Sequence, residues 1–205
     1  PKGMQSYARM AKHGDGIPVN YDEAAYYYKS AADKGEIYAM ISYADMLKKG
    51  TEIIPDKKEA ARYYKMAADK GNSNSMYCYA VMLENGEGIP INIKEAIHYY
   101  KMAIDEGNSN AMNNYASILK KGIETPIDKE KAAHYYKMAI DKGNSGSIIS
   151  YAIMLKNGDG IPVNKKDAAY YFKMAADKGY SLAMLNYAQM IYNGDDVPVN
   201  KKEAA

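Results

Sequence analysis

Residues 158–179 read GDGIPVNKKDAAYYFKMAADKG, and this pattern of glycine, proline, alanine and paired aromatic residues recurs along the chain every 36 residues. A tyrosine followed by alanine keeps the same interval, and so does the glycine that closes the quoted stretch. No insertion or deletion disturbs the register. Periods of this length are typical of solenoids that stack helical units. The tyrosines are Tyr7, Tyr43, Tyr79, Tyr115, Tyr151 and Tyr187, and the glycines are Gly35, Gly71, Gly107, Gly143 and Gly179.

The repeat predicts one domain over residues 1–205, with incomplete copies at both ends. Residues 1–14 are expected to form the second helix of a truncated copy, and residues 195–205 the start of a further copy. The five full copies are expected at residues 15–50, 51–86, 87–122, 123–158 and 159–194.

The first helix of each copy has a clear start signal. An Asn or Asp stands where its side chain can accept hydrogen bonds from the unpaired amides of a first helical turn. Three residues later an acidic residue resembles a capping box and complements the positive helix start, with Lys131 as the exception. A proline lies just upstream and is moved by one position in the second copy, to Pro55. The caps are Asn20, Asp56, Asn92, Asp128, Asn164 and Asn200; the acidic residues are Glu23, Glu59, Glu95, Asp167 and Glu203; the other prolines are Pro18, Pro90, Pro126, Pro162 and Pro198.

Glycine marks the end of both helices in a copy. The glycine at Gly35 and its equivalents is the residue type that adopts a left-handed C-cap at least cost. The second helix then runs to the next glycine of the pattern. The spacing predicts helices over residues 21–34 and 37–49, repeated every 36 residues, and no β-strand. The closing glycines of the second helices are Gly50, Gly86, Gly122, Gly158 and Gly194.

The apolar residues of each helix fall on one stripe. At 100° per residue, positions i, i+3, i+4 and i+7 share a face. Neither helix of a copy can bury its stripe alone, so neighbouring copies must stack. The sequence therefore predicts an all-α fold, a two-layer α/α solenoid of 36-residue helix-turn-helix repeats. The predicted stripes include Ala24, Tyr27, Tyr28 and Ala31, then Ala60, Tyr63, Tyr64 and Ala67, in first helices, and Met40, Tyr43, Ala44 and Leu47, then Met76, Tyr79, Ala80 and Leu83, in second helices.

The stretch from Gly158 to Gly179 resembles the Sel-one-like repeat family of the tetratricopeptide superfamily, and the resemblance covers essentially the whole chain. Tyr-Ala, as at Tyr115 and Ala116, replaces the family's usual Leu-Gly in the second helix. Alternate copies also carry an acidic residue at the second glycine of the Gly-x-Gly loop, namely Glu52, Glu124 and Asp196. The resemblance implies a right-handed superhelical solenoid. It also implies adaptor or scaffold roles in assembling protein complexes, and it brings no catalytic residues.

Composition excludes several classes of function. The formal net charge is only +2, and acidic and basic residues alternate, which argues against nucleic-acid binding. The apolar runs are too short for a membrane span. The chain has a single cysteine, Cys78, which cannot form an internal disulfide. Its apolar neighbours in the sequence favour a buried structural role. The use of a single cysteine also favours a cytosolic location for the protein.

One exposed position of the first helix differs between copies and is the best candidate for binding a partner. It lies about 200° around the helix from Ala24, and the resemblance places it in the concave groove. Arg and Tyr are frequent in interface hot spots, and His can make a contact pH-sensitive. Tolerated surface residues are the alternative interpretation. The row is Tyr26, Arg62, His98, His134 and Tyr170.

A second candidate row consists of lysines that precede an aspartate by four residues in every copy. Such pairs either bind an extended charged peptide or simply form a solvated helix face, where each contributes a few tenths of a kcal/mol. The row is Lys29, Lys65, Lys101, Lys137 and Lys173, followed by Asp33, Asp69, Asp105, Asp141 and Asp177.

A metal or cofactor is not expected. His98 and His134 stand at equivalent positions, but no further ligand with matching spacing accompanies them. The Gly-x-Gly loops lack the strand-to-helix setting of a nucleotide site and are interpreted as turns. No nucleophile, base and orienting group can be assembled from the sequence.

The sequence therefore predicts a non-enzymatic scaffold that binds a protein or peptide ligand. One alternative is hydrolysis of β-lactam compounds, which the resemblance associates with cysteine-rich relatives, although those carry paired cysteines in each repeat. Another is an architectural spacer that associates end to end through the incomplete terminal copies.

Overall fold

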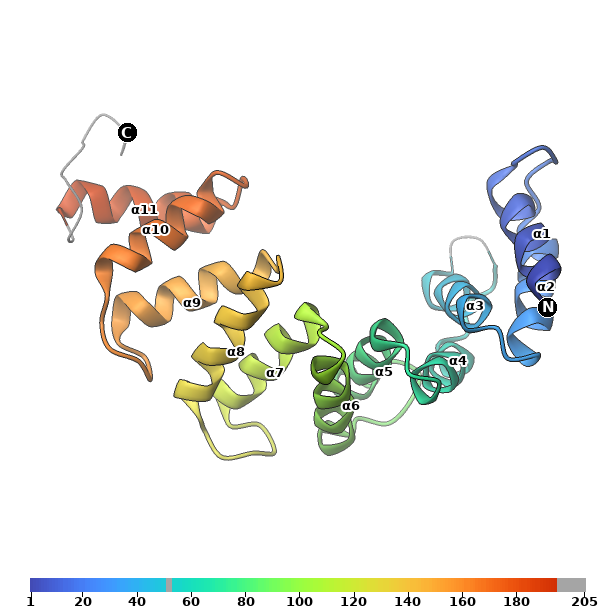
Figure 1. Cartoon of the computed structure of the whole chain (residues 1–205), viewed down its shortest axis with the longest axis horizontal. Helices are drawn as coiled ribbons and strands as arrows, with labels where there is room; N and C mark the ends of the chain where they lie inside the picture. Colours follow the sequence, from blue (N-terminus) through green and yellow to red (C-terminus); the bar gives the residue numbers. More distant parts are fainter. Residues whose placement is uncertain (51–52, 195–205) are drawn as a thin grey trace. The chain divides into compact units, whose positions relative to one another are not determined.

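The computed structural model describes residues 1–50 and 53–194, and this part of the chain contains eleven helices and no strand (Figure 1). The chain divides into two compact units, residues 1–106 and 107–205. In each unit every helix packs on the helices before and after it in the sequence. The first unit holds α1 (Lys2–His13), α2 (Tyr21–Asp33), α3 (Ile37–Lys49), α4 (Lys57–Asp69), α5 (Ser73–Asn85) and α6 (Ile93–Asp105); the second holds α7 (Ser109–Lys121), α8 (Lys129–Asp141), α9 (Gly146–Asn157), α10 (Lys165–Ala176) and α11 (Ser181–Asn193).

These bounds confirm the predicted all-α repeat of helix pairs. The first helices are α2, α4, α6, α8 and α10, and the second helices are α1, α3, α5, α7, α9 and α11. Several sequence predictions lie outside the described residues: the helix start at Asn200 with Pro198 and Glu203, the copy at 195–205, and the loop residues Glu52 and Asp196.

The predicted N-caps of the described first helices are confirmed. In each, the cap side chain accepts a hydrogen bond from the backbone amide three residues on, as Asp56 does from Glu59 at 2.9 Å. The capping-box interpretation needs correction, because the cap's own amide donates to a carbonyl of the preceding helix. The distance is 3.1 Å from Asp56 N to Leu47 O. Equivalent bonds start at Asn20, Asn92, Asp128 and Asn164, so the cap residue also closes the loop onto the second helix.

The first helices end as predicted, with glycine in the left-handed region. Gly35 has a φ of 94°. Its amide donates to Ala32 O at 2.9 Å, and the amide of Glu36 donates to Ala31 O at 3.2 Å. These two bonds form a Schellman motif, which satisfies the carbonyls at the helix end and turns the chain into the second helix.

The Gly-x-Gly loop brings neighbouring copies close together. A Cβ placed on Gly88 would lie 2.4 Å from the carbonyl carbon of Lys57, and one on Gly160 would lie 2.8 Å from that of Lys129. Gly88 and Gly160 are thus favoured both for their positive φ and for their lack of a side chain. Glu124, which replaces the second glycine of the loop in another copy, adopts the same left-handed region with a φ of 53°.

The core of the first unit follows the predicted stripes with two exceptions. Tyr63 and Tyr64 on α4 and Met76 and Tyr79 on α5 are buried. Tyr27, by contrast, is only half-buried, and so is Tyr43. The ring of Tyr27 packs edge to face on that of Tyr7 at 4.8 Å, and the ring of Tyr43 packs in the same way on Tyr63 at 5.0 Å. These rings lie at the margin between first and second helices, where one edge remains accessible.

The second unit has its own core cluster of α9, α10 and α11. Phe172 is fully buried and takes the position that Tyr64 and Tyr100 occupy in the first unit. Ile148 and Leu155 pack against it from α9. Tyr38 and Tyr180, which fall outside the repeat pattern, are exposed.

We expect Gly88→Ala to lower the free energy of unfolding more than Gly16→Ala. Both glycines have a positive φ, of 77° and 80°, which costs an alanine about 1–2 kcal/mol. Only Gly88 contacts neighbouring backbone, because the space around Gly16 is open. The clash should add about 1–3 kcal/mol to the cost at Gly88. Urea midpoints of the two variants measure the difference, and equal midpoints would show that the close approach does not contribute to stability.

Candidate functional site

The candidate binding row is exposed at every predicted position. Tyr26 and Tyr170 are exposed by 66% and 61%, and Arg62, His98 and His134 are also exposed. Each side chain packs on the tyrosine that follows it in sequence. The guanidinium carbon of Arg62 lies 4.1 Å from the centre of the Tyr63 ring, and His98 packs edge to face on Tyr99 at 5.5 Å. Tyr26, His134 and Tyr170 make the same contact with Tyr27, Tyr135 and Tyr171.

The lysine row forms the predicted ion pairs at three described positions. Lys29 pairs with Asp33 at 3.1 Å, Lys65 pairs with Asp69 at 3.1 Å, and Lys137 Nζ lies 2.5 Å from Asp141. Some of these lysines also lie over a tyrosine ring of another helix. The ammonium of Lys65 is 5.7 Å from the Tyr99 ring, that of Lys137 is 5.9 Å from Tyr171, and that of Lys173 is 5.1 Å from Tyr187.

The aspartates of this row connect successive first helices of the first unit. Asp33 on α2 accepts a hydrogen bond from the Tyr63 hydroxyl of α4 at 2.7 Å, and Asp69 on α4 accepts one from Tyr99 of α6 at 3.3 Å. The bond from Tyr63 and the neighbouring ammonium of Lys29 lower the pKa of Asp33. Sequence reasoning missed these bonds, although an aspartate followed by a tyrosine 30 residues later was the signal. The lysine row is therefore more than a solvated face, because its partners hold neighbouring copies together.

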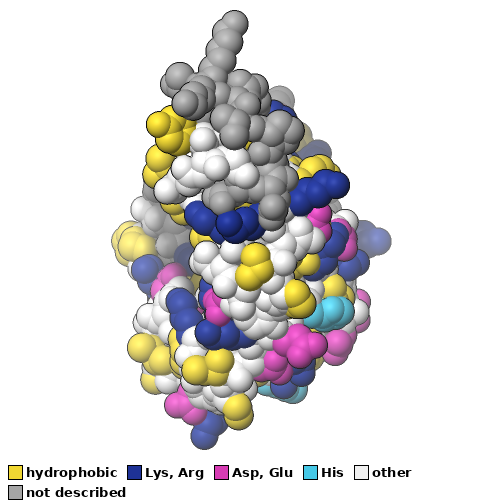
Figure 2. Space-filling model, turned by 90° about the vertical axis from the view of Figure 1, so that its left-hand side faces the viewer, with side chains coloured by type: hydrophobic (Ala, Val, Ile, Leu, Met, Phe, Trp, Pro, Cys, Tyr) yellow, Lys and Arg dark blue, Asp and Glu magenta, His cyan; other side chains and the backbone are white. Residues whose placement is uncertain are grey.

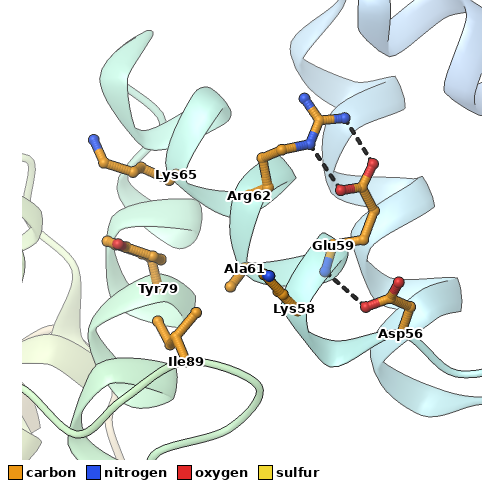
Figure 3. A pocket seen from close by; sticks show the side chains of 8 residues that line it. All are labelled: Asp56, Lys58, Glu59, Ala61, Arg62, Lys65, Tyr79 and Ile89. Carbon is orange, nitrogen blue, oxygen red and sulfur yellow. Dashed lines mark hydrogen bonds and ion pairs between the residues drawn. The ribbon is translucent and has the colours of Figure 1, made fainter.

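Arg62 and Lys65 contribute to a depression of about 480 Å³ in the first unit (Figure 3). Arg62 is fixed by two hydrogen bonds to the Glu59 carboxylate, 2.8 Å from Nε and 2.7 Å from Nη2. The same contact raises the pKa of Arg62 and lowers that of Glu59. Sequence reasoning did not single out the remaining lining residues as a site. The lining consists of Asp56, Lys58, Glu59, Ala61, Arg62, Lys65, Tyr79 and Ile89.

In the second unit His134 lines a smaller depression of about 370 Å³ with Asp128, Glu130 and Lys131. Lys131 is the residue that departs from the acidic pattern of the first helical turn. The two units therefore present different chemistry around equivalent positions.

Within the described residues, no group of three or more His, Cys, Asp and Glu side chains could hold a metal ion. No helix of the described part is both long and apolar enough to cross a membrane. Cys78 is half-buried, and burial raises the pKa of its thiol to about 11, so little reactive thiolate forms at neutral pH. Figure 2 shows positive and negative side chains interspersed over the face that it presents.

The Sel1 repeat family model matches residues 1–36, 37–72, 73–108, 109–144, 147–180 and 181–205, and the chain therefore belongs to this family of tetratricopeptide-like helical repeats. Sel1 repeat proteins generally serve as protein-interaction scaffolds, and a helical-repeat scaffold is typical of proteins that are not enzymes. No curated protein matches the sequence.

Solved structures with the same fold span several bacteria. A protective antigen of uropathogenic Escherichia coli strains has a TM-score of 0.93 at 21% identity, over 98% of this chain and 43% of that one. A Sel1 repeat protein from Oxalobacter formigenes has a TM-score of 0.86 at 26% identity, over 98% of this chain and 82% of that one. Cysteine-rich protein B of Helicobacter pylori has a TM-score of 0.51 at 22% identity, over 65% of this chain and 96% of that one. This chain thus spans less than half the length of the Escherichia coli antigen.

We expect Tyr63→Phe to lower the free energy of unfolding by about 1–2 kcal/mol at neutral pH, because Asp33 loses its hydroxyl donor. The pKa of Asp33 is lowered in the folded state, so this contribution is present above its ordinary pKa of about 4 and is lost as the pH falls through the folded value. Burial, and after it the bond to Asp33, raises the pKa of Tyr63 to about 12, so the contribution is also lost as the pH rises from about 10 through that value.

Denaturation midpoints of wild type and variant across this pH range measure the effect. The control is Tyr38→Phe, which removes a hydroxyl from a side chain that is 70% exposed. Equal losses in both variants, or a loss independent of pH, would contradict a structural role for the Tyr63–Asp33 bond.

Proposed function

We propose that this chain is a non-catalytic scaffold that binds a partner protein through the exposed surface of its first helices. The variable row supplies specificity: Tyr26, Arg62 and His98 in the first unit, and His134 and Tyr170 in the second. The observation that carries the proposal is that these residues differ between copies while the tyrosine beneath each one is the same. A common platform thus presents different side chains.

The physical basis of the proposal is the cost of ordering a side chain on binding. A side chain that already rests on a ring has less freedom to lose when a partner contacts it. Arg62 is held further by Glu59, and Tyr and Arg are the residue types that most often dominate interface energetics. The row therefore combines exposure with partial pre-organisation.

The lysines have a supporting role in this proposal. The side chains of Lys29, Lys65 and Lys137 remain exposed by 46%, 44% and 41% although each is paired. With Lys101 and Lys173 they place an exposed lysine beside an aspartate in each copy, and such a lysine can contact an acidic partner without selecting among partners. Their identity in every copy fits this general function.

Two other functions compete with the proposal. Hydrolysis of β-lactams, the activity that the resemblance associates with cysteine-rich relatives, is disfavoured by a single, half-buried Cys78 with a raised pKa. Turnover of nitrocefin, abolished by one point mutation, would establish it. Association of copies end to end as an architectural spacer would show as a concentration-dependent mass in light scattering.

We expect replacement of all five row residues by alanine to weaken capture of the native partner by at least about tenfold while leaving the melting temperature nearly unchanged. The partner is first captured from the source cell and identified by mass spectrometry, and its affinity is then measured for each variant. A matched control replaces four exposed residues near the ends of second helices: Lys49, Asn85, Lys121 and Asn157. Full-strength capture by the row variant would show that the partner binds elsewhere.

A further inference from the structure

Two adjoining depressions on the first unit share a wall made by Tyr79 of α5 and Ile89 of the following loop. The first, of about 480 Å³, continues onto α4, where Figure 3 shows Ala61 between this wall and the side chains of Lys58 and Arg62. The second, of about 370 Å³, is also lined by Leu83, Pro90, Ile91, Asn92 and Glu95. A ligand that crosses the shared wall therefore contacts both.

The charges around the first depression favour an anion. Its two carboxylates are already engaged, because Asp56 accepts the Glu59 amide at 2.9 Å and Glu59 is bonded twice to Arg62. Lys58 is exposed and pairs with no carboxylate among the described residues. Lys65 lies at the margin, where its ammonium pairs with Asp69 at 3.1 Å. An incoming carboxylate thus meets the Lys58 ammonium, which no described carboxylate pairs, next to the edge of the Arg62 guanidinium.

The second depression is lined by apolar side chains and Tyr79, together with Asn92 and Glu95. Leu83 is buried, whereas Ile91 is exposed by 65% and offers surface to a ligand. Glu95 accepts a hydrogen bond from Asn92 at 2.9 Å and one from the Tyr79 hydroxyl at 3.5 Å. This part favours an aliphatic side chain and disfavours a second anion.

We propose that the two depressions together bind an extended segment of a partner protein that carries an acidic residue and, two positions away, an aliphatic residue. Side chains two apart in an extended chain point the same way and lie about 7 Å apart, so they can enter adjoining depressions. The acidic side chain pairs with Lys58 and contacts Arg62, while the aliphatic side chain covers Tyr79, Ile89 and Ile91. This inference rests on the proposed function and names the chemistry of the partner.

This copy differs from its neighbours at the two positions that matter. The residues equivalent to Lys58 and Arg62 are Asp22 and Tyr26 in the preceding copy and Lys94 and His98 in the following one. Lys58 and Arg62 are the only pair of the five copies in which both side chains are fully cationic at neutral pH. The acidic preference therefore belongs to this copy and not to the repeat in general.

The test titrates the isotope-labelled chain with blocked peptides and follows backbone amide shifts by NMR, which detects millimolar binding. The acidic peptide is GSDSLSG, its neutral isostere is GSNSLSG, and GSDSGSG lacks the aliphatic group. The variant is Lys58→Gln, and the matched control is Lys94→Gln, at the equivalent position of α6 and outside the lining of both depressions.

We expect GSDSLSG to shift the amides around Lys58, Arg62 and Ile89 and to bind about three- to fivefold more tightly than either other peptide. Added salt should lower the affinity for GSDSLSG until it approaches the affinity for GSNSLSG. Lys58→Gln should remove the preference for the acidic peptide, and Lys94→Gln should preserve it.

Three results would overturn the inference: no shifts with any peptide, shifts located away from these residues, or equal effects of Lys58→Gln and Lys94→Gln. The proposed function fails by a different measurement, namely full capture of the native partner by the five-residue row variant. If the row variant loses capture while Lys58→Gln keeps the preference for the acidic peptide, the scaffold proposal stands and only this subsite is excluded.

Discussion

Alanine on the inner face of every first helix is the constraint on which the rest of the structure depends. The five equivalent residues have no exposed surface. A methyl group lets the adjacent helix approach closely, and the large rings beside it fill the remaining space. A larger side chain at this position would force the helices apart, which costs about 1–3 kcal/mol in a packed core. The residues are Ala24, Ala60, Ala96, Ala132 and Ala168.

Close packing also determines which positions remain free to vary. The alanines and the buried rings of each first helix face the neighbouring helices. The residue that precedes Tyr27, or its equivalent in another copy, therefore points outward. It rests on that ring in all five copies. The lysine row is less free, because the aspartates that pair with Lys29 and Lys65 also accept hydrogen bonds from Tyr63 and Tyr99. Identical rows thus hold copies together, while the variable row is available for contacts.

The sequence predicted the local features of the fold because each depends on a few adjacent residues. Asn20 caps a helix through an amide three residues away, and Gly35 ends one through bonds to Ala31 and Ala32. The contacts between copies could not be predicted in this way. Whether the Tyr63 hydroxyl reaches Asp33 depends on the offset of one helix against the next, which the period of the sequence does not specify.

The same limit applies to the candidate site. Exposure of the variable row follows from helical periodicity, and the prediction for Arg62 needed nothing more. The depression beside it also requires Tyr79 from a second helix and Ile89 from a loop, and these meet α4 only in the folded chain. The half-buried Tyr27 and Tyr43 were missed for a related reason, since periodicity gives the direction of a side chain but not where the neighbouring helix ends.

Equivalent positions with different side chains give each copy its own chemistry on an unchanged backbone. Two positions of each first helix, the second and the sixth after the N-cap, illustrate this. They hold an acidic and an aromatic residue in α2, Asp22 and Tyr26, but two basic residues in α4, Lys58 and Arg62. In α8 of the second unit they hold Glu130 and His134, beside the exceptional Lys131. Because the caps and core stripes do not involve the side chains of these pairs, substitutions there can change the charge of the surface with little effect on packing. Differences in partner preference between copies therefore arise from side chains that the fold does not need.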